Sequence, residues 1–199
     1  IEKADQALYN SKQRGRNRVS VWDSKMGRTL NRTDKLAGLV TGNMDQDNRN
    51  LLSLMNILEL SKENKGLEYK TYYFLGEILE SLEASHGSLI LVEENQISSS
   101  YTRERFIEAW VENRNYNIDI IEEVLESKRG NYQRDWENIE SIDSISGLPN
   151  WQSIIVLPVI KNDIVKAILY LSVALRNKEF DFGDFNLASY YANAYGTNL

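Results

Sequence analysis

The chain of 199 residues contains no cysteine, one histidine and only two prolines. Without cysteine it can form no disulfide, thiolate zinc site, cysteine nucleophile or thioether-linked chromophore. The single imidazole, His86, also excludes a metal site built from several histidines of one chain. No low-complexity tract is present and 42% of the residues are hydrophobic, which is typical of a globular protein.

Long apolar runs and an excess of positive charge are also missing. No apolar run approaches the ~20 residues that span a bilayer, and Lys166 interrupts the longest candidate. The sequence shows neither an initiator Met nor an export leader, so we expect a cytoplasmic chain that is part of a longer protein. A net charge of −6 argues against DNA binding. Only residues 12–18, with four basic side chains, could contact phosphates.

The strongest structural signal lies in residues 151–173, where two apolar runs flank Lys161-Asn162-Asp163. Asn and Asp tolerate left-handed backbone angles, so this trio predicts a hairpin turn. The β-branched residues favour strands over a buried helix. Both faces of both strands are apolar, so we expect cover on both sides. Pro158 cannot donate to a β-ladder and is predicted at a bulge or with its nitrogen facing outward.

Three helices are predicted at residues 48–64, 67–85 and 185–194, with Asp47 capping the first. The apolar residues of helix 48–64 cover more of its circumference than the single stripe of a surface helix. Exposed leucines of that number would form an unusually large apolar patch. We therefore expect a homodimer through helices 48–85.

The middle of the chain gives weaker signals. We predict strands at 88–92 and 96–101, the second at a sheet edge, and a helix at 120–129. Spacing favours a helix at 102–113, although alternating apolar residues leave a strand open. His86 is expected near the end of helix 67–85 in a structural role. Residues 131–149 are predicted to form a weak strand and a long loop.

The first 22 residues carry a more specific pattern, Ala4-Asp5-x-Ala7-Leu8-Tyr9-x-x-Lys12-x-x-Gly15-Arg16-Asn17-Arg18-Val19. This pattern resembles the closing helix and strand of GGDEF domains, the diguanylate cyclases. The resemblance implies that Lys12 and Arg16 contact the phosphates of GTP, for which an amine and a guanidinium are suited. The Gly-Gly loop and metal-binding carboxylates of that family are absent from this sequence and would lie upstream of Ile1. This chain is therefore expected to be non-catalytic and without a cofactor or metal, with GTP and Mg²⁺ bound by the parent cyclase.

From about residue 50 to the end, the predicted order of elements resembles a GAF domain: helices, strand pair, helix, long loop, hairpin, F-x-x-x-D and a closing helix. The resemblance implies an α+β fold, with a six-stranded antiparallel sheet, helices on one face and a pocket on the other, used as a sensor in signalling proteins. The expected organisation is a GGDEF remnant at 1–22, a linker at 23–47 and a GAF domain at 48–199.

A second resemblance lies within this region, at Asn177-Lys178-x-Phe180-x-x-x-Asp184. It is similar to the signature of GAF domains that bind cyclic nucleotides. The spacer is one residue instead of several, and Phe185 replaces the family's Glu. We interpret the pattern as general GAF architecture.

A small-molecule pocket is predicted between the hairpin and the loop 131–149, because the second sheet face needs cover and aromatic residues lie there. The candidate lining residues are Tyr132, Trp136, Trp151 and Tyr170, although each could simply complete the core. The favoured function is a ligand-sensing and dimerising module of a diguanylate cyclase that signals through cyclic dimeric GMP. An interaction-only module without a ligand, or part of a degenerate nucleotide-binding GGDEF protein, are the alternatives.

Overall fold

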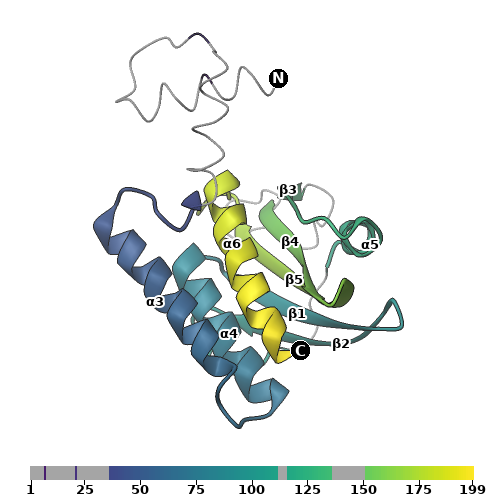
Figure 1. Ribbon diagram of the computed structural model, residues 1–199. Helices are drawn as coiled ribbons and strands as arrows, with labels where there is room; N and C mark the ends of the chain where they lie inside the picture. The colour runs from purple at the N-terminus through teal and green to yellow at the C-terminus, as the bar shows by residue number, and fades with distance from the viewer. Residues whose placement is uncertain (1–6, 8–20, 22–35, 112–115, 136–150) are drawn as a thin grey trace. The chain divides into compact units, whose positions relative to one another are not determined.

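The computed structural model describes residues 7, 21, 36–111, 116–135 and 151–199 of a chain that divides into two units, 1–37 and 38–199. The second unit contains all the helices and strands described below (Figure 1). Its helices are α3 (Met44–Leu60), α4 (Leu67–Leu82), α5 (Ile118–Ser127) and α6 (Phe182–Tyr195), followed by a 3₁₀ turn, η2 (Gly196–Asn198). Its strands are β1 (His86–Glu93), β2 (Gln96–Glu104), β3 (Asn131–Asp135), β4 (Gln152–Lys161) and β5 (Ile164–Ala174).

The strands form one antiparallel sheet in the order β2-β1-β5-β4-β3. The predicted α+β class is confirmed, and the polar strand β2 lies at a sheet edge as expected. The GAF resemblance implied six strands, whereas the described residues form five.

The predicted hairpin is β4 and β5. Asn162 and Asp163 at its turn both have positive φ, 53° and 61°, the backbone geometry that two-residue hairpin turns require. Pro158 lies beside the register shift between Val159 and Ile160. Because β3 pairs with β4 only as far as Val156, β3 requires no hydrogen bond from Pro158. Pro158 was predicted at a bulge or with its nitrogen facing outward; it pairs with Ile168, and the register shift follows one residue later.

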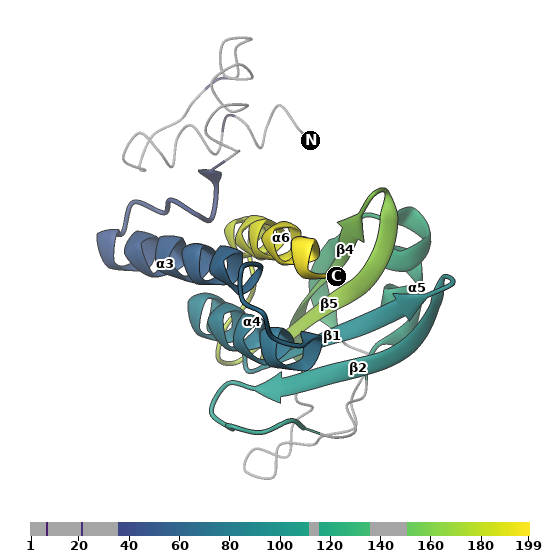
Figure 2. The ribbon, with the colours of Figure 1, turned by 60° about the horizontal axis from the view of Figure 1, so that its bottom comes forward.

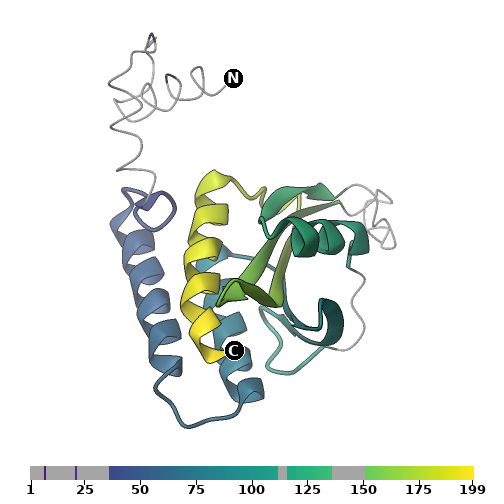
Figure 3. The same cartoon turned by 45° about the vertical axis from the view of Figure 1, so that its right-hand side comes forward.

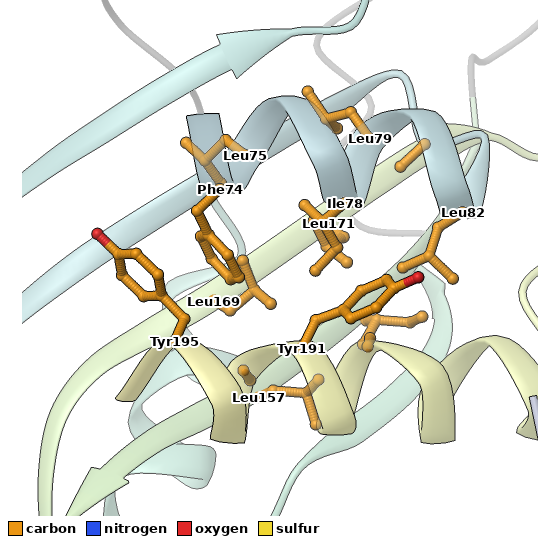
Figure 4. Close-up of a cluster of buried hydrophobic side chains, with 14 of the residues drawn as sticks. Phe74, Leu75, Ile78, Leu79, Leu82, Leu157, Leu169, Leu171, Tyr191 and Tyr195 are labelled. Carbon is orange, nitrogen blue, oxygen red and sulfur yellow. The ribbon is translucent and has the colours of Figure 1, made fainter. Parts of the chain in front are cut away.

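Helices α3, α4 and α6 lie together on one side of the sheet, and α5 lies on the other (Figures 2 and 3). The core on the three-helix side contains strand residues Leu89, Leu157, Leu169 and Leu171 together with α4 and α6 (Figure 4). Strand residues with the opposite orientation, Ile90, Ile154, Val156 and Ile168, pack with α5. The sheet is thus covered on both faces.

Two buried tyrosines attach α6 to α4. Tyr191 and Tyr195 share hydrogen bonds of 2.7 Å with the hydroxyls of Ser81 and Thr71, and Phe74 stacks on Tyr195 with ring centroids 4.0 Å apart (Figure 4). Burial raises the pKa of each tyrosine to about 12, because an ionised phenolate would lose its hydration there.

Asn50 connects the start of this unit to its helices. Its fully buried side chain donates to Gly38 O at 2.9 Å and accepts from Ser81 Oγ at 3.0 Å. The Tyr191 hydroxyl donates to Asn50 O at 3.1 Å. This network fixes α3 against α4 and α6.

The structure corrects the predicted start of the first helix. Helix α3 begins four residues earlier than expected, and its cap is Asn43, whose side chain accepts from the backbone N–H groups of Asp45 and Gln46. Asp47 does not cap the helix. Its carboxylate instead accepts from Thr41 N at 2.6 Å and Thr41 Oγ1 at 2.7 Å, and these bonds lower the pKa of Asp47.

Two further predictions were wrong. The segment 102–113 does not begin a helix, because β2 continues to Glu104 and Trp110 bridges back to Arg103. His86 is not at a helix end. Helix α4 stops at Leu82, where Glu83 adopts a left-handed conformation, and His86 opens β1 with its Nε2 3.1 Å from Glu104 Oε1.

The two tyrosines predict loss of stability in alkali. The unfolded chain releases these protons near pH 10 and the folded chain near pH 12. Stability from the buried neutral rings is therefore full below pH 10 and falls as the pH rises toward 12. The loss between pH 9 and 11 should be about 1 kcal/mol for each ring, measured by urea unfolding. Tyr195→Phe should remove about half of this loss. An unchanged pH dependence in Tyr195→Phe would contradict the assignment.

Candidate functional site

A row of polar side chains crosses the sheet face that α5 covers. The strand registers place Thr102 of β2 opposite Ser88 of β1, and Ser88 opposite Tyr170 of β5. All three side chains are buried. Most of their neighbours on this face are aliphatic, with the buried Ser172, which pairs with Ile154, as a further polar residue, so the row is a polar strip in a largely apolar surface.

Hydroxyl groups form a chain along this strip. Ser88 Oγ and Thr102 Oγ1 are 2.8 Å apart, and Thr102 Oγ1 is 2.7 Å from the Tyr116 hydroxyl. The Tyr116 ring meets Tyr170 at a steep angle, with centroids 5.4 Å apart. Because a hydroxyl can donate or accept, this chain can adapt its hydrogen bonds to a bound polar group.

A buried carboxylate lies at the end of the same face. Asp135 is 5% exposed at the last position of β3 and accepts from Asn117 Nδ2 at 3.3 Å. Asn117 also caps α5, since its side chain accepts from Ile120 N. In sequence, Asp135 directly precedes residues 136–150 and Tyr116 directly follows residues 112–115, two segments outside the described residues.

These groups can exchange hydrogen bonds with a polar ligand. The described residues of the strip offer hydroxyls, two phenol rings and one carboxylate. No group of three or more histidine, aspartate or glutamate side chains that could hold a metal occurs in the part of the chain that the structure describes.

The structure separates the residues predicted to line one pocket. Tyr132 pairs with Ile155, on the three-helix face, and its ring lies 5.3 Å from Phe185 of α6. Tyr170 is on the opposite face. Trp151 is 40% exposed just before β4, and Trp136 lies outside the described residues. Of the predicted set, only Tyr170 is seen at the α5 face.

Sequence reasoning missed Ser88, Thr102, Tyr116 and Asp135. Ser88 gave the one usable signal, because it is a polar residue at the start of the apolar run Leu89 to Val92. The predicted phosphate-contacting residues, Lys12 and Arg16, lie outside the described residues.

The residues of the Asn-Lys-x-Phe pattern lie on the other side of the sheet. Lys178 Nζ is 2.9 Å from Asp184 Oδ1 and donates to Leu82 O at 2.8 Å, which joins the start of α6 to the end of α4. Burial raises the pKa of Asp184, and Lys178 partly offsets this effect. These contacts are structural, as the interpretation of the pattern as general architecture expects.

Comparison with known proteins bears on the fold. No protein-family model matches the sequence, and no curated protein matches it. Among solved structures, the chain resembles the GAF domain of A. aeolicus nlh2 in an inactive state, with a TM-score of 0.52 and 16% identity over 76% of this chain and 95% of that chain.

Two further GAF domains come from phosphoenolpyruvate-protein phosphotransferases. That of Coxiella burnetii has a TM-score of 0.52 and 13% identity, over 74% of this chain and 90% of that one. That of Acinetobacter has a TM-score of 0.50 and 15% identity, over 78% and 92%. The chain therefore has the GAF fold. None of its described helices has the length and hydrophobicity to cross a membrane.

The hydroxyl chain predicts that Thr102→Val is destabilising. Valine keeps the shape of threonine but leaves the hydroxyls of Ser88 and Tyr116 without their shared partner. The expected loss is about 1–3 kcal/mol in urea unfolding. Ser100→Ala, on the exposed part of the same strand, is the control and should change stability by less than about 0.5 kcal/mol. A similarly small effect of Thr102→Val would show that the hydroxyl chain does not stabilise the folded protein.

Proposed function

We propose that this chain is a regulatory module that senses a ligand, forms a homodimer and is itself non-catalytic. The observation that carries the proposal is the buried polar strip on the α5 face of a GAF-type sheet. Polar groups in an apolar face cost free energy unless they are hydrogen-bonded. A ligand that replaces or extends these bonds can therefore favour one conformation over another, which is the physical basis of sensing.

The effector is proposed to be a small molecule with both a flat ring and polar groups. Tyr116 and Tyr170 offer ring contacts, and the hydroxyl chain and Asp135 offer donors and acceptors. Trp136, which lies outside the described residues, is kept as a further proposed lining residue.

A thermal-melting screen tests for the effector. We expect at least one compound of a nucleotide and amino-acid panel to raise the melting temperature, because a ligand at 100 times its Kd stabilises the native state by about 2.7 kcal/mol. Thr102→Val should weaken this response, and Ser100→Ala should not. A panel without any response would favour the alternative of an interaction-only module.

The proposed homodimer forms through helices 48–85, chiefly through the outer side of α3. Four of its apolar side chains, spaced by seven, four and three residues, are 43–78% exposed: Met44, Leu51, Met55 and Leu58. This is the spacing of a coiled-coil seam. The inner side of the helix, with Ile57 and Leu60, is separately buried in the core.

The dimer proposal predicts that Met55→Glu with Leu58→Glu gives monomers in light scattering, because carboxylates buried in an apolar seam are costly. Leu54 is not a useful target, since it packs against the core of its own chain. Ile97→Glu, at an equally exposed position of β2, is the matched control and should remain dimeric. A wild-type chain that is monomeric at tens of micromolar would refute the proposal.

The finer proposal places this module after a diguanylate cyclase domain, with residues 1–22 as the end of that domain, 23–47 as a linker and 48–199 as the sensor. Its support is the pattern from Ala4 to Val19, including Lys12 and Arg16. Two such cyclase domains must meet to make cyclic dimeric GMP, so a sensor that changes dimer geometry could set the rate. A gene that encodes no Gly-Gly loop and metal-binding carboxylates ahead of Ile1 would contradict a cyclase parent. A Gly-Gly loop without those carboxylates would favour a degenerate nucleotide-binding protein.

A further inference from the structure

An open cavity lies on the outer side of α4, away from the polar strip. Figure 2 shows α4 beside β2, and the chain after β2 returns to this helix at Trp110. The cavity here has a volume of about 490 Å³ and is lined by Gly66, Glu68, Tyr69, Tyr72, Tyr73 and Trp110. Four of its six lining residues are aromatic, and one is a carboxylate.

The aromatic rings meet at steep angles. Tyr72 is nearly perpendicular to Trp110, at 87° with centroids 5.3 Å apart, and to Tyr73, at 80° and 5.8 Å. Tyr69 lies 4.6 Å from Tyr73 at 48°. Because the rings are inclined to one another, their faces point in different directions around the cavity. Tyr69 and Tyr73 remain 38% and 47% exposed, so they are not core residues.

Two cations of the chain already lie over these rings. The Arg103 guanidinium is 4.0 Å from the centroid of Tyr72 and donates to Tyr72 O at 2.8 Å. It fits because position 76 is glycine: a methyl group there would collide with the guanidinium. Lys65 Nζ is 5.5 Å from the centroid of Tyr69. Ring faces attract positive charge, and these contacts show two of the faces in that role.

A carboxylate is held among the rings. Glu68 Oε1 accepts from Trp110 Nε1 at 3.0 Å, and no ion pair of Glu68 occurs among the described residues. The lining of the adjoining cavity, about 470 Å³, includes both acidic and basic side chains: Glu77, Glu80, Glu108, Arg103 and Arg105. A hydrogen bond with Tyr73, partial desolvation and the charge of Glu63 raise the pKa of Tyr69. The site thus combines four aromatic rings with the carboxylate of Glu68.

We propose that this cavity binds the quaternary ammonium group of a small organic cation. A primary ammonium has three N–H donors and a guanidinium five, all of which need acceptors. The lining offers one carboxylate, one oxygen of which already accepts from Trp110, and beyond it only phenol oxygens, which are weaker acceptors. A methylated ammonium has no donors, and its charge is stabilised by ring faces and by Glu68 without hydrogen bonds. Lys65 occupies the rim and competes for the Tyr69 face.

The test is an NMR titration with choline, following the indole N–H resonance of Trp110, which Trp110→Phe identifies. The comparison ligand is 3,3-dimethylbutan-1-ol, which has the shape of choline with carbon in place of the charged nitrogen. Choline should shift the resonance saturably, with an affinity at least about tenfold above that of the neutral alcohol and of ethanolamine. Equal affinities for choline and the alcohol would overturn the proposal. A resonance that moves with protein concentration but not with choline would also overturn it, in favour of a contact between chains.

Matched variants locate the binding. Tyr73→Leu should weaken choline binding about tenfold, because leucine keeps an apolar side chain but removes the ring face. Lys65→Ala should strengthen binding, since it removes the competing ammonium; a merely structural lysine would not have this effect. Tyr132→Leu, at a ring of similar exposure in β3, should leave binding unchanged. Unchanged binding in both Tyr73→Leu and Lys65→Ala would refute the site. None of these results depends on the proposed effector at the α5 face.

Discussion

The rest of the structure depends on one constraint: the hairpin of β4 and β5 is apolar on both faces, and both must be kept from water. Burying a leucine or isoleucine side chain contributes about 1.5–3 kcal/mol, so leaving one face of the hairpin uncovered would cost about as much free energy as the whole stability of a typical domain. Helices α3, α4 and α6 cover one face and α5 covers part of the other. The two sides differ in how their buried polar groups are arranged, and this difference suits the helix side to a structural role and the α5 side to binding.

On the three-helix side, buried side chains of the helices are hydrogen-bonded to one another. Tyr191 and Tyr195 reach hydroxyls of α4, and Asn50 binds backbone carbonyls and Ser81. Such closed networks fix helix positions and leave little for a ligand to gain. On the α5 side, the hydroxyl chain from Ser88 ends at Tyr116, which directly follows residues 112–115, and Asp135 directly precedes residues 136–150. Connecting segments on a rigid sheet are where binding sites usually occur.

The sequence predicted the parts of the fold that local chemistry decides. The hairpin followed from β-branched runs around Asn162-Asp163, and the extra apolar side of α3 from its leucines. It did not predict the parts that depend on long-range register. Tyr132 and Tyr170 were expected in one pocket, but the face of a strand residue is set by its pairing, and a shift of one residue moves it to the opposite face. Asp47 was expected to cap α3, because Asp is a favoured residue at a helix N-terminus. The sequence does not show that Asn43 caps the helix instead, or that the Asp47 carboxylate accepts from Thr41 N. The segment 102–113 was misread because Trp110 pairs with β2, a contact that helical spacing does not show.

Under the proposed function, a signal from the α5 face must cross the sheet to reach the outer side of α3. Helix α3 packs on α4 and α6, and these helices pack on the strands. Strand β1 provides a short route, because Ser88 belongs to the polar strip while its neighbour Leu89 packs in the three-helix core. A displacement of β1 by a ligand therefore acts on α4 directly. Helix α4 passes it to α3 through Ser81 and Asn50, a buried hydrogen bond that cannot stretch far without leaving polar atoms unpaired. The same closed network that stabilises the helix layer would thus make it move as one body, which is the property that a dimerising sensor needs.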